Sequence, residues 1–323
     1  MRVLLIVNPT ASSVTPRAQA AIVDALGVDH DLEVALTSSR NHASELARDA
    51  AAAQVDVVVV LAGDGTLNEA AQGLVGTDTA LAPLPGGSTN VFARTLGVAY
   101  DPLSACAQLL RTLEATTPQR VGVGVARTDE FARHFLFHLG VGFDAAAVRE
   151  MEERHTHLKR HLAHPAFALA TVETWLRGYD RTTEISVTTT GRDGAGPVTI
   201  QGPYAVVSNS DPYTYVGRRA VTLAPDAALD GPLAVTVFDS LRVSLLVRAA
   251  LSAAARARFV EHSPDITQVP DVWQVSLASE RPFPWQVDGD HLGSTTRIDV
   301  GYEADCLSLV VPREPRGRHQ ARR

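Results

Sequence analysis

The sequence predicts two domains of different fold class: an α/β domain with a parallel sheet, followed by an all-β domain. Strand-like and helix-like segments alternate over the first 125 or so residues, and strands joined by single helices form a parallel sheet with helices on both faces. From about residue 119, long strand-like segments follow one another, mostly without helices between them. That pattern is typical of an antiparallel sandwich or barrel. A chain of 323 residues is long enough for two such cores.

The first domain, residues 1–125, contains short apolar runs that each end in a polar turn. The four consecutive valines before Gly63 are typical of a strand buried on both faces. Thr15 is placed to cap a helix that Pro16 starts and Gly27 stops. The expected strands are 2–7, 32–37, 55–63 and 80–85, and the expected helices are 16–27, 42–54 and one that begins at Thr66.

The second domain is expected over residues 126–312, with the alternative that its last strands return to the first domain. The segment "TGRDGAG" (190–196) has the composition of a hairpin turn. The expected strands are 181–189, 197–210, 220–223, 232–239, 267–279, 284–288, 296–302 and 305–312, and helices are expected at about 145–178 and 241–258. Residues 313–323 are basic and show no apolar periodicity, so we expect a disordered tail.

Composition excludes several classes of protein. The formal net charge of -7 argues against a nucleic-acid partner. Two cysteines, Cys106 and Cys306, are too few for a zinc site and are expected to be buried thiols of a reducing compartment. No apolar run approaches membrane-spanning length, and the apolar stretch near Met1 is too short for a signal peptide. The expected location is therefore cytoplasmic, with any membrane contact peripheral.

The turn from Gly63 to Thr66 connects a buried strand to the helix that follows it. Ligands of open parallel sheets bind beyond the carboxyl ends of the strands. Glycines let backbone N–H groups approach an anion, and a helix N-terminus adds unpaired donors, so the turn predicts a phosphate site. Asp64 would repel a phosphate unless a cation or a proton transfer intervenes, which suggests Mg²⁺ or contact with an incoming hydroxyl. The alternative is that Asp64 only caps its helix.

Two further polar turns follow strands of the same predicted sheet. "NPTAS" (8–12) follows the first strand and "PGGSTN" (85–90) follows the fourth. We therefore expect three turns to converge at one sheet edge. The lysine of a Walker loop is missing, which excludes a P-loop enzyme.

The ordered motifs resemble the diacylglycerol kinase catalytic family, which includes bacterial lipid kinases and is similar to sphingosine and ceramide kinases. They are "NPTAS", "LAGDGTLNE", "PGGSTNVFAR", "GVGFDA", "LAPDAALDGPLAV" and "QVDGD", and the match extends to about residue 312. The resemblance implies an N-terminal domain like that of NAD kinase and phosphofructokinase, a C-terminal β-sandwich, and ATP in the cleft between them. It implies transfer of the ATP γ-phosphoryl group to a lipid hydroxyl, most simply that of diacylglycerol.

The resemblance also implies site residues. Asp290 stands where the family has its catalytic base, and Asp64 would hold Mg²⁺ or position the nucleophile. The implied structural Mg²⁺ site is Asp230 with the backbone of Ala227 and Pro232. The implied ATP contacts are Asn8, Pro9, Thr10, Ala11, Ser12, Thr37, Gly63, Asp64, Gly65, Thr66, Leu67, Asn68, Glu69 and Ser88.

Three positions depart from the family pattern. Ala62 replaces a glycine, and Ser88 stands where threonine is commoner. Asp290 replaces glutamate, and a misplacement of ~1 Å costs on the order of 10²-fold in rate. Three outcomes stay open: the backbone compensates, the enzyme is slow, or the protein is no kinase.

The segment 140–178 carries a second signal. Asp144 is expected to cap a helix, with no catalytic role. A basic run follows, and it is either a solvated face or a surface that contacts anionic lipid. In the second case, the apolar residues after it would contact acyl chains. The run is Arg154, His155, His157, Lys159, Arg160, His161 and His164, and the apolar residues are Phe167, Leu169, Val172, Trp175 and Leu176.

Two other functions stay open: an NAD kinase-like phosphotransferase with a soluble substrate, and a lipid- or nucleotide-binding regulator without catalysis. The oligomeric state is also open, a homodimer being one alternative.

Overall fold

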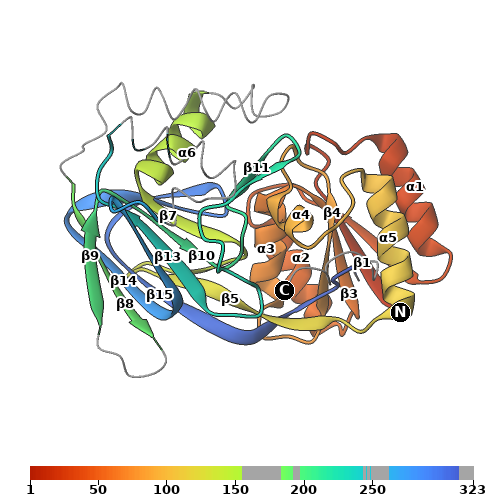
Figure 1. Ribbon diagram of the computed structural model, residues 1–323. Coiled ribbons are helices and arrows are strands. Elements are labelled where there is room, and N and C mark those ends of the chain that lie inside the picture. The colour runs from red at the N-terminus through yellow and green to blue at the C-terminus, as the bar shows by residue number, and fades with distance from the viewer. Residues whose placement is uncertain (155–182, 192–196, 243–244, 246–247, 249–261, 313–323) are drawn as a thin grey trace, which may run out of the picture.

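The structure is a computed structural model, and it describes residues 1–154, 183–191, 197–242, 245, 248 and 262–312. Two halves lie side by side, an α/β half and a β-rich half (Figure 1). No helix among the described residues is long and apolar enough to cross a membrane. The basic run from residue 155 onward, the apolar residues 167–176 and the tail 313–323 lie outside the described residues.

The N-terminal half is a parallel sheet in the order β4-β3-β1-β2. Its strands are β1 (Arg2–Val7), β2 (Asp31–Leu36), β3 (Val57–Ala62) and β4 (Ala80–Pro85). Its helices are α1 (Pro16–Gly27), α2 (His42–Ala52), α3 (Asp64–Leu74), α4 (Val91–Thr95) and α5 (Pro102–Ala115). Thr15 caps α1 as predicted, its hydroxyl oxygen accepting from the amide of Ala18 at 3.1 Å.

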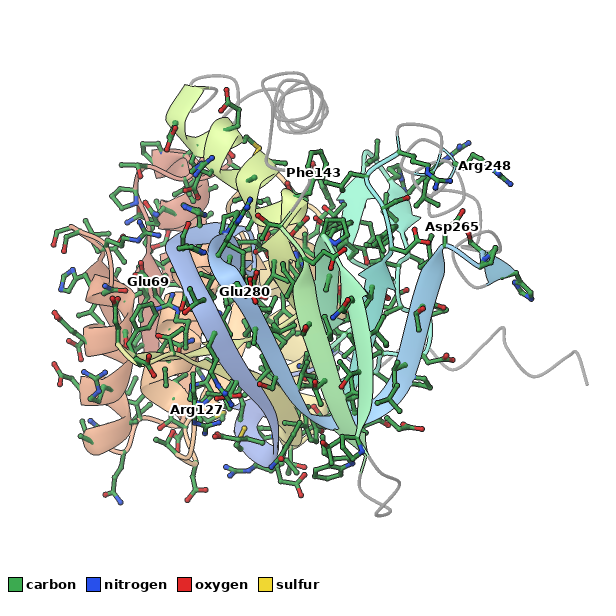
Figure 2. All side chains as sticks on the ribbon, turned by 90° about the vertical axis from the view of Figure 1, so that its left-hand side faces the viewer. Glu69, Arg127, Phe143, Arg248, Asp265 and Glu280 are labelled. Carbon is green, nitrogen blue, oxygen red and sulfur yellow. The ribbon has the colours of Figure 1, made fainter. Side chains whose placement is uncertain are left out.

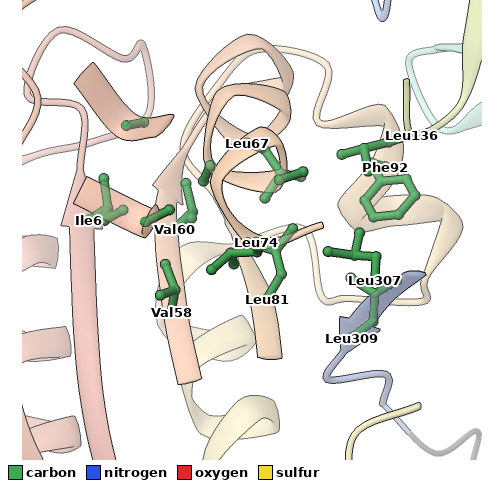
Figure 3. Close-up of a cluster of buried hydrophobic side chains, with 14 of the residues drawn as sticks. Ile6, Val58, Val60, Leu67, Leu74, Leu81, Phe92, Leu136, Leu307 and Leu309 are labelled. Carbon is green, nitrogen blue, oxygen red and sulfur yellow. The ribbon is translucent and has the colours of Figure 1, made fainter. Parts of the chain in front are cut away.

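The run of valines explains why this sheet is covered on both faces. All six residues of β3 are buried, and because side chains alternate along a strand, successive valines enter different cores. Val58 and Val60 pack in the cluster that includes α2 and α3, whereas Val57 and Val59 pack in the cluster with α1 and α5. Figure 3 shows the first cluster, which extends beyond the sheet to Phe92, Leu136, Leu307 and Leu309.

The C-terminal half is antiparallel and is hydrogen-bonded to the first half. Its strands are β5 (Gln119–Arg127), β6 (Ala132–Phe135), β7 (His138–Gly142), β8 (Ile185–Gly191), β9 (Val198–Gly202), β10 (Tyr204–Ser208), β11 (Thr214–Val216), β12 (Arg219–Val221), β13 (Leu233–Phe238), β14 (Ile266–Val287) and β15 (Asp290–Leu309). The described sheet runs in the order β13-β10-β7-β14-β15-β4-β3-β1-β2, with β5, β6, β8 and β9 attached to it. At its end, β15 pairs in parallel with β4 through Leu309 and Leu81.

The helix α6 (Phe143–Arg154) stands over this half. The ring of Phe143, labelled at its base in Figure 2, packs edge-on against Tyr204 with 6.5 Å between ring centroids. Tyr204 in turn stacks on Phe238 at 4.5 Å. This aromatic row fixes where α6 leaves the sheet.

Several element boundaries differ from the prediction. The segment 197–210 is two strands with different partners, because Pro203 has no N–H to donate to a ladder. Conversely, the expected strands 267–279 and 284–288 merge into one strand, β14, which ends at Val287 and whose pairing with β15 shifts register between Ala278 and Phe283. The helix expected at Thr66 begins at Asp64. Cys106 is buried, but Cys306 is only partly so.

Candidate active site

The three predicted turns meet at the carboxyl edge of the parallel sheet. The side-chain amide of Asn8 donates to the hydroxyl of Thr66 at 3.1 Å, which joins the first turn to the second. Ser13 joins the first turn to the third, since its amide donates to the carbonyl of Gly86 at 2.8 Å and its hydroxyl to that of Gly87 at 3.1 Å. The topology inferred from the sequence is confirmed at this edge.

Glycine is required where the second and third turns touch. A Cβ on Gly87 would lie 2.7 Å from Cα of Gly63, and one on Gly86 would lie 2.8 Å from Cα of Ala62. Backbone occupies the space on both sides, so no side chain can move away. The glycines therefore allow two loops to lie in van der Waals contact.

The Asp64 carboxylate does not serve as the N-cap of α3, because Gly63 holds that position. Its two oxygens accept instead from the amides of Val91 at 2.9 Å and Phe92 at 3.1 Å, the first residues of α4. The alternative of a cap for its own helix is thereby corrected: Asp64 binds the N-terminus of a different helix. The contact fixes the position of the carboxylate, and Asp64 still lines the cleft described next.

A cleft of about 520 Å³ lies between the two halves and is lined by residues of both. Ten predicted site residues line it: Asn8, Thr10, Ala11, Ser12, Gly63, Asp64, Gly65, Thr66, Ser88 and Asp290. The remaining lining residues are Gly87, Thr89, Val91, Phe137, His138, Val148, Met151, Tyr213, Thr214, Val216, Asp288 and Gly289. The N-terminal wall is mostly small and polar, whereas the opposite wall is largely apolar or aromatic.

Five predicted nucleotide contacts are not among the lining residues. Leu67 is buried in the core, Asn68 bonds to Asp288, and Glu69, labelled in Figure 2, is buried on α3. Pro9 is exposed in the first turn, and Thr37 follows β2, its amide bonded to the carbonyl of Val7. The structure brings none of these five to the cleft.

Asp290 reaches the N-terminus of α3 from the other half of the chain. A Cβ added to Gly65 would lie 3.3 Å from both carboxylate oxygens of Asp290, so the carboxylate rests against the first turn of α3. Arg40 lies 4.0 Å from the same carboxylate. The residue that the sequence assigns as the base therefore faces the turn that it assigns to phosphate.

Asp288 was not predicted as a site residue, yet it ties together the elements that carry the others. Its carboxylate accepts four hydrogen bonds, from the amides of Leu136, Phe137 and His138 at 2.7, 3.0 and 3.0 Å and from the side chain of Asn68 at 2.7 Å. Burial raises its pKa to about 7, and the four donors act in the opposite direction. The motif "QVDGD" contains this aspartate, but its partners lie 150 or more residues away.

The opposite wall contains a buried polar cluster that the sequence analysis did not find. The hydroxyl of Tyr213 donates to Asp144, and the side-chain amide of Gln286 donates to the other carboxylate oxygen at 2.7 Å. Asp144 therefore holds the cleft wall, which corrects the expectation that it caps α6. Burial raises its pKa. A Cβ on Gly140 would collide with this carboxylate, so the glycine of "GVGFDA" makes room for it.

His138 is enclosed beside this cluster. Its ring centroid lies 4.4 Å from that of Tyr213, and its Nδ1 atom is buried without a hydrogen-bond partner in the described structure. Burial lowers the pKa of His138 to about 3. The ring is therefore neutral at physiological pH and acts as an aromatic wall.

The low pKa of His138 predicts a pH-dependent stability. The unfolded chain binds a proton at His138 below about pH 6.5, whereas the folded chain does not until about pH 3, so stability falls as pH falls through this window. Between pH 7.5 and 5 we expect the wild type to lose about 2 kcal/mol more unfolding free energy than His138→Phe, which cannot titrate. Urea unfolding at both pH values checks this. Parallel losses in the two proteins would contradict it.

The residues predicted to form a structural metal site lie outside the cleft. Asp230 is exposed and Ala227 is buried on the segment between β12 and β13, and Pro232 directly precedes β13. The described residues contain no group of three or more histidine, cysteine, aspartate or glutamate side chains arranged to hold a metal. This site stays a prediction.

Two family models match the chain over the regions just described. The diacylglycerol kinase catalytic domain matches residues 2–121. The YegS C-terminal NAD kinase beta sandwich-like domain matches residues 138–310, more than half of the chain. The chain belongs to the YegS-like diacylglycerol kinase family. The family's NAD kinase-like β-sandwich domain and its catalytic domain thus account for the two halves of the structure.

Two relatives match a shorter part of the chain at higher identity. The chain is 36% identical over 131 residues to the protein named "Probable lipid kinase YegS-like" of Chromohalobacter salexigens, a match covering 39% of this chain and 40% of that one. It is 36% identical over 69 residues to the "Diacylglycerol kinase" of Bacillus subtilis, covering 21% and 23%. These alignments thus span less than half of each relative. A crystal structure of a diacylglycerol kinase from Bacillus anthracis shares the fold, with a TM-score of 0.68, 22% identity and 97% of both chains covered.

Proposed function

We propose that this protein is an ATP-dependent lipid kinase that transfers the γ-phosphoryl group of ATP to a lipid hydroxyl, with diacylglycerol as the acceptor and phosphatidic acid as the product. The observation that carries the proposal is the placement of Asp290. This carboxylate rests against the glycine turn of α3 inside a cleft with one polar and one apolar wall. Membership of a lipid kinase family supports the same reaction.

The polar wall suits a triphosphate. The residues proposed to hold it are Asn8, Thr10, Ala11, Ser12, Gly63 to Thr66 and Ser88. The first turn of α3 offers amides that have no partner within the helix, together with the positive end of its dipole. Asn8 and Thr66 are bonded to each other at 3.1 Å, so the two turns hold their relative position before a nucleotide arrives. Preorganised donors of this kind stabilise charge that develops during transfer.

The residues present fit Mg²⁺. Mg²⁺ at a nucleotide takes one or two protein carboxylates besides phosphate oxygens and water, and Asp64, which lines the cleft, would supply one. The amides of Val91 and Phe92 orient Asp64, as groups around a metal ligand commonly do. The ion would neutralise charge on the transferring phosphoryl group.

Asp290 is proposed as the proton acceptor for the lipid hydroxyl. A hydroxyl is a weak nucleophile, and a carboxylate within hydrogen-bond reach takes its proton as the bond to phosphorus forms. The apolar wall opposite, from Phe137, Val148, Met151 and Val216, suits an acceptor with acyl chains. This lining favours a lipid over the soluble dinucleotide of the NAD kinase-like alternative. An acceptor of this kind resides in a membrane, so we propose peripheral contact with the inner membrane face.

A radiolabelled ATP assay tests the proposal. Purified protein is incubated with [γ-³²P]ATP, Mg²⁺ and mixed micelles containing diacylglycerol, monoacylglycerol, a sphingoid base or a glycolipid, with NAD as the soluble acceptor. We expect label in the diacylglycerol product, and none when Mg²⁺ is chelated. Label in NAD alone would support the soluble-substrate alternative, and ATP binding without transfer to any acceptor would support the non-catalytic one.

A further inference from the structure

The hairpin formed by β11 and β12 stands apart from the main sheet. Among the described strands these two pair only with each other. The hairpin nevertheless forms part of the cleft, since Thr214 and Val216 line it and so does the adjoining Tyr213. Figure 1 shows the hairpin, labelled at β11, reaching from the β-rich half towards α4. Side-chain contacts must therefore decide where this wall of the cleft stands.

Arg94 of α4 provides the contact at the tip of the hairpin. Its guanidinium carbon lies 3.6 Å from the ring centroid of Tyr215, and its Nη2 donates to the carbonyl of Gly217 at 2.9 Å. The ring of Tyr100 lies on the guanidinium as well, at 5.6 Å. A planar guanidinium can stack on a ring and donate in its own plane at once, which a lysine ammonium cannot do.

The base of the hairpin is held within the β-rich half, to which the hairpin itself belongs. Tyr213 donates to the buried Asp144 and packs on the ring of His138. Arg94 is therefore one contact by which the nucleotide-side half reaches the hairpin tip, beside the Thr95 side chain and the apolar cluster that Tyr215 also meets. Arg94 lies on the same short helix whose first amides bind Asp64. One helix of five residues thus connects the acid of the glycine turn to the acceptor wall.

We propose that Arg94 is a positioning residue for the lipid acceptor: it holds the β11–β12 hairpin at the distance from the glycine turn that seats the acceptor hydroxyl beside Asp290. This inference rests on the proposed lipid kinase function. Arg94 does not itself line the cleft, so it acts through Thr214 and Val216. Its loss changes acceptor binding, and it leaves the nucleotide wall in place because the hydrogen bonds from α4 to Asp64 are made by the backbone.

The experiment compares Arg94→Met, Arg94→Lys and Tyr215→Leu with Arg111→Met, an exposed arginine of α5, as the matched control. The first measurement is hydrogen exchange, by mass spectrometry, of peptides that cover residues 214–221. We expect these peptides to exchange faster than in the wild type in Arg94→Met and in Tyr215→Leu. In the control, Arg111→Met, we expect the wild-type exchange rate. This measurement requires no kinase activity. Unchanged exchange in both variants would overturn the proposal.

The second measurement is the KM for each substrate in the micelle assay. For Arg94→Met we expect the KM for diacylglycerol to rise about tenfold, equivalent to about 1.4 kcal/mol, while the KM for ATP changes by less than about twofold. Arg94→Lys keeps the positive charge but loses the planar guanidinium group. Its KM for diacylglycerol is therefore expected to lie between those of the wild type and Arg94→Met. The double variant Arg94→Met/Tyr215→Leu is expected to raise the KM by less than the two single effects combined, because both substitutions remove the Arg94–Tyr215 stack.

The outcomes separate this inference from the proposed function. Equal rises in both KM values, or an additive double variant, would overturn the positioning role while lipid phosphorylation stands. A wild type that phosphorylates no lipid would overturn the proposed function and the acceptor role with it, whatever the exchange of the hairpin shows.

Discussion

Replacing Asp290 with asparagine is expected to lower the rate of lipid phosphorylation by about 10³-fold, within the range that a positioned general base contributes. Asparagine keeps the size of the side chain but cannot take a proton. ATP binding is expected to stay within about threefold of the wild type, because the amides and hydroxyls of the polar wall are untouched. Single-turnover transfer from [γ-³²P]ATP to diacylglycerol and equilibrium ATP binding are the two measurements.

Asp290→Glu and Asp290→Ala complete the test of this residue. The family resemblance implies glutamate at this position. Asp290→Glu therefore tests whether the backbone is adapted to the shorter side chain. The carboxylate already rests 3.3 Å from where a Gly65 Cβ would lie. We therefore expect a longer side chain to bring no gain, and Asp290→Ala to be as slow as the asparagine variant. Full activity in Asp290→Asn would show that Asp290 is not the proton acceptor.

The part of this site that lies at strand ends could be predicted from sequence. Parallel strands are recognisable from their apolar runs, and their carboxyl ends share one edge, so the turns at 8–12, 63–66 and 85–90 had to meet. Local chemistry also identified the cap at Thr15. In each case the information lies within a few residues of the feature that it specifies.

The sequence could not show which distant residues the side chains of a given helix or strand contact. Asn68 was expected at the nucleotide because the family resemblance implied it, yet its side chain donates to Asp288, 220 residues away. Arg94 is separated by 123 residues from the carbonyl that it binds. The same holds for Asp64, since a favoured capping residue followed by a helix is the pattern of a self-cap, and only the placement of α4 shows that it caps another helix. Such pairings follow from the packing of whole elements.

Asp288→Ala is expected to lower the free energy of unfolding by about 4 kcal/mol, because it removes the acceptor of four buried donors. Three of these are consecutive backbone amides that run from the end of β6 to the first residue of β7, which have no freedom to find water. Urea unfolding at pH 6, below the pKa of about 7, measures the effect, because burial raises this pKa and the contribution of Asp288 to stability falls as the pH rises through it. Asp299→Ala is the control, since its two hydrogen bonds to Arg297 are exposed and are expected to contribute less than about 1 kcal/mol.

Asp288→Ala is also expected to slow lipid phosphorylation. Asp290 is two residues further along the chain, and Asn68 fixes α3, against whose first turn the Asp290 carboxylate rests. Below the urea transition we therefore expect Asp288→Ala to be slower than the wild type even where it is fully folded, whereas Asp299→Ala keeps the wild-type rate. A folded Asp288→Ala protein with wild-type turnover would mean that the tie between α3 and the β14–β15 turn supports stability alone, and that other contacts place Asp290.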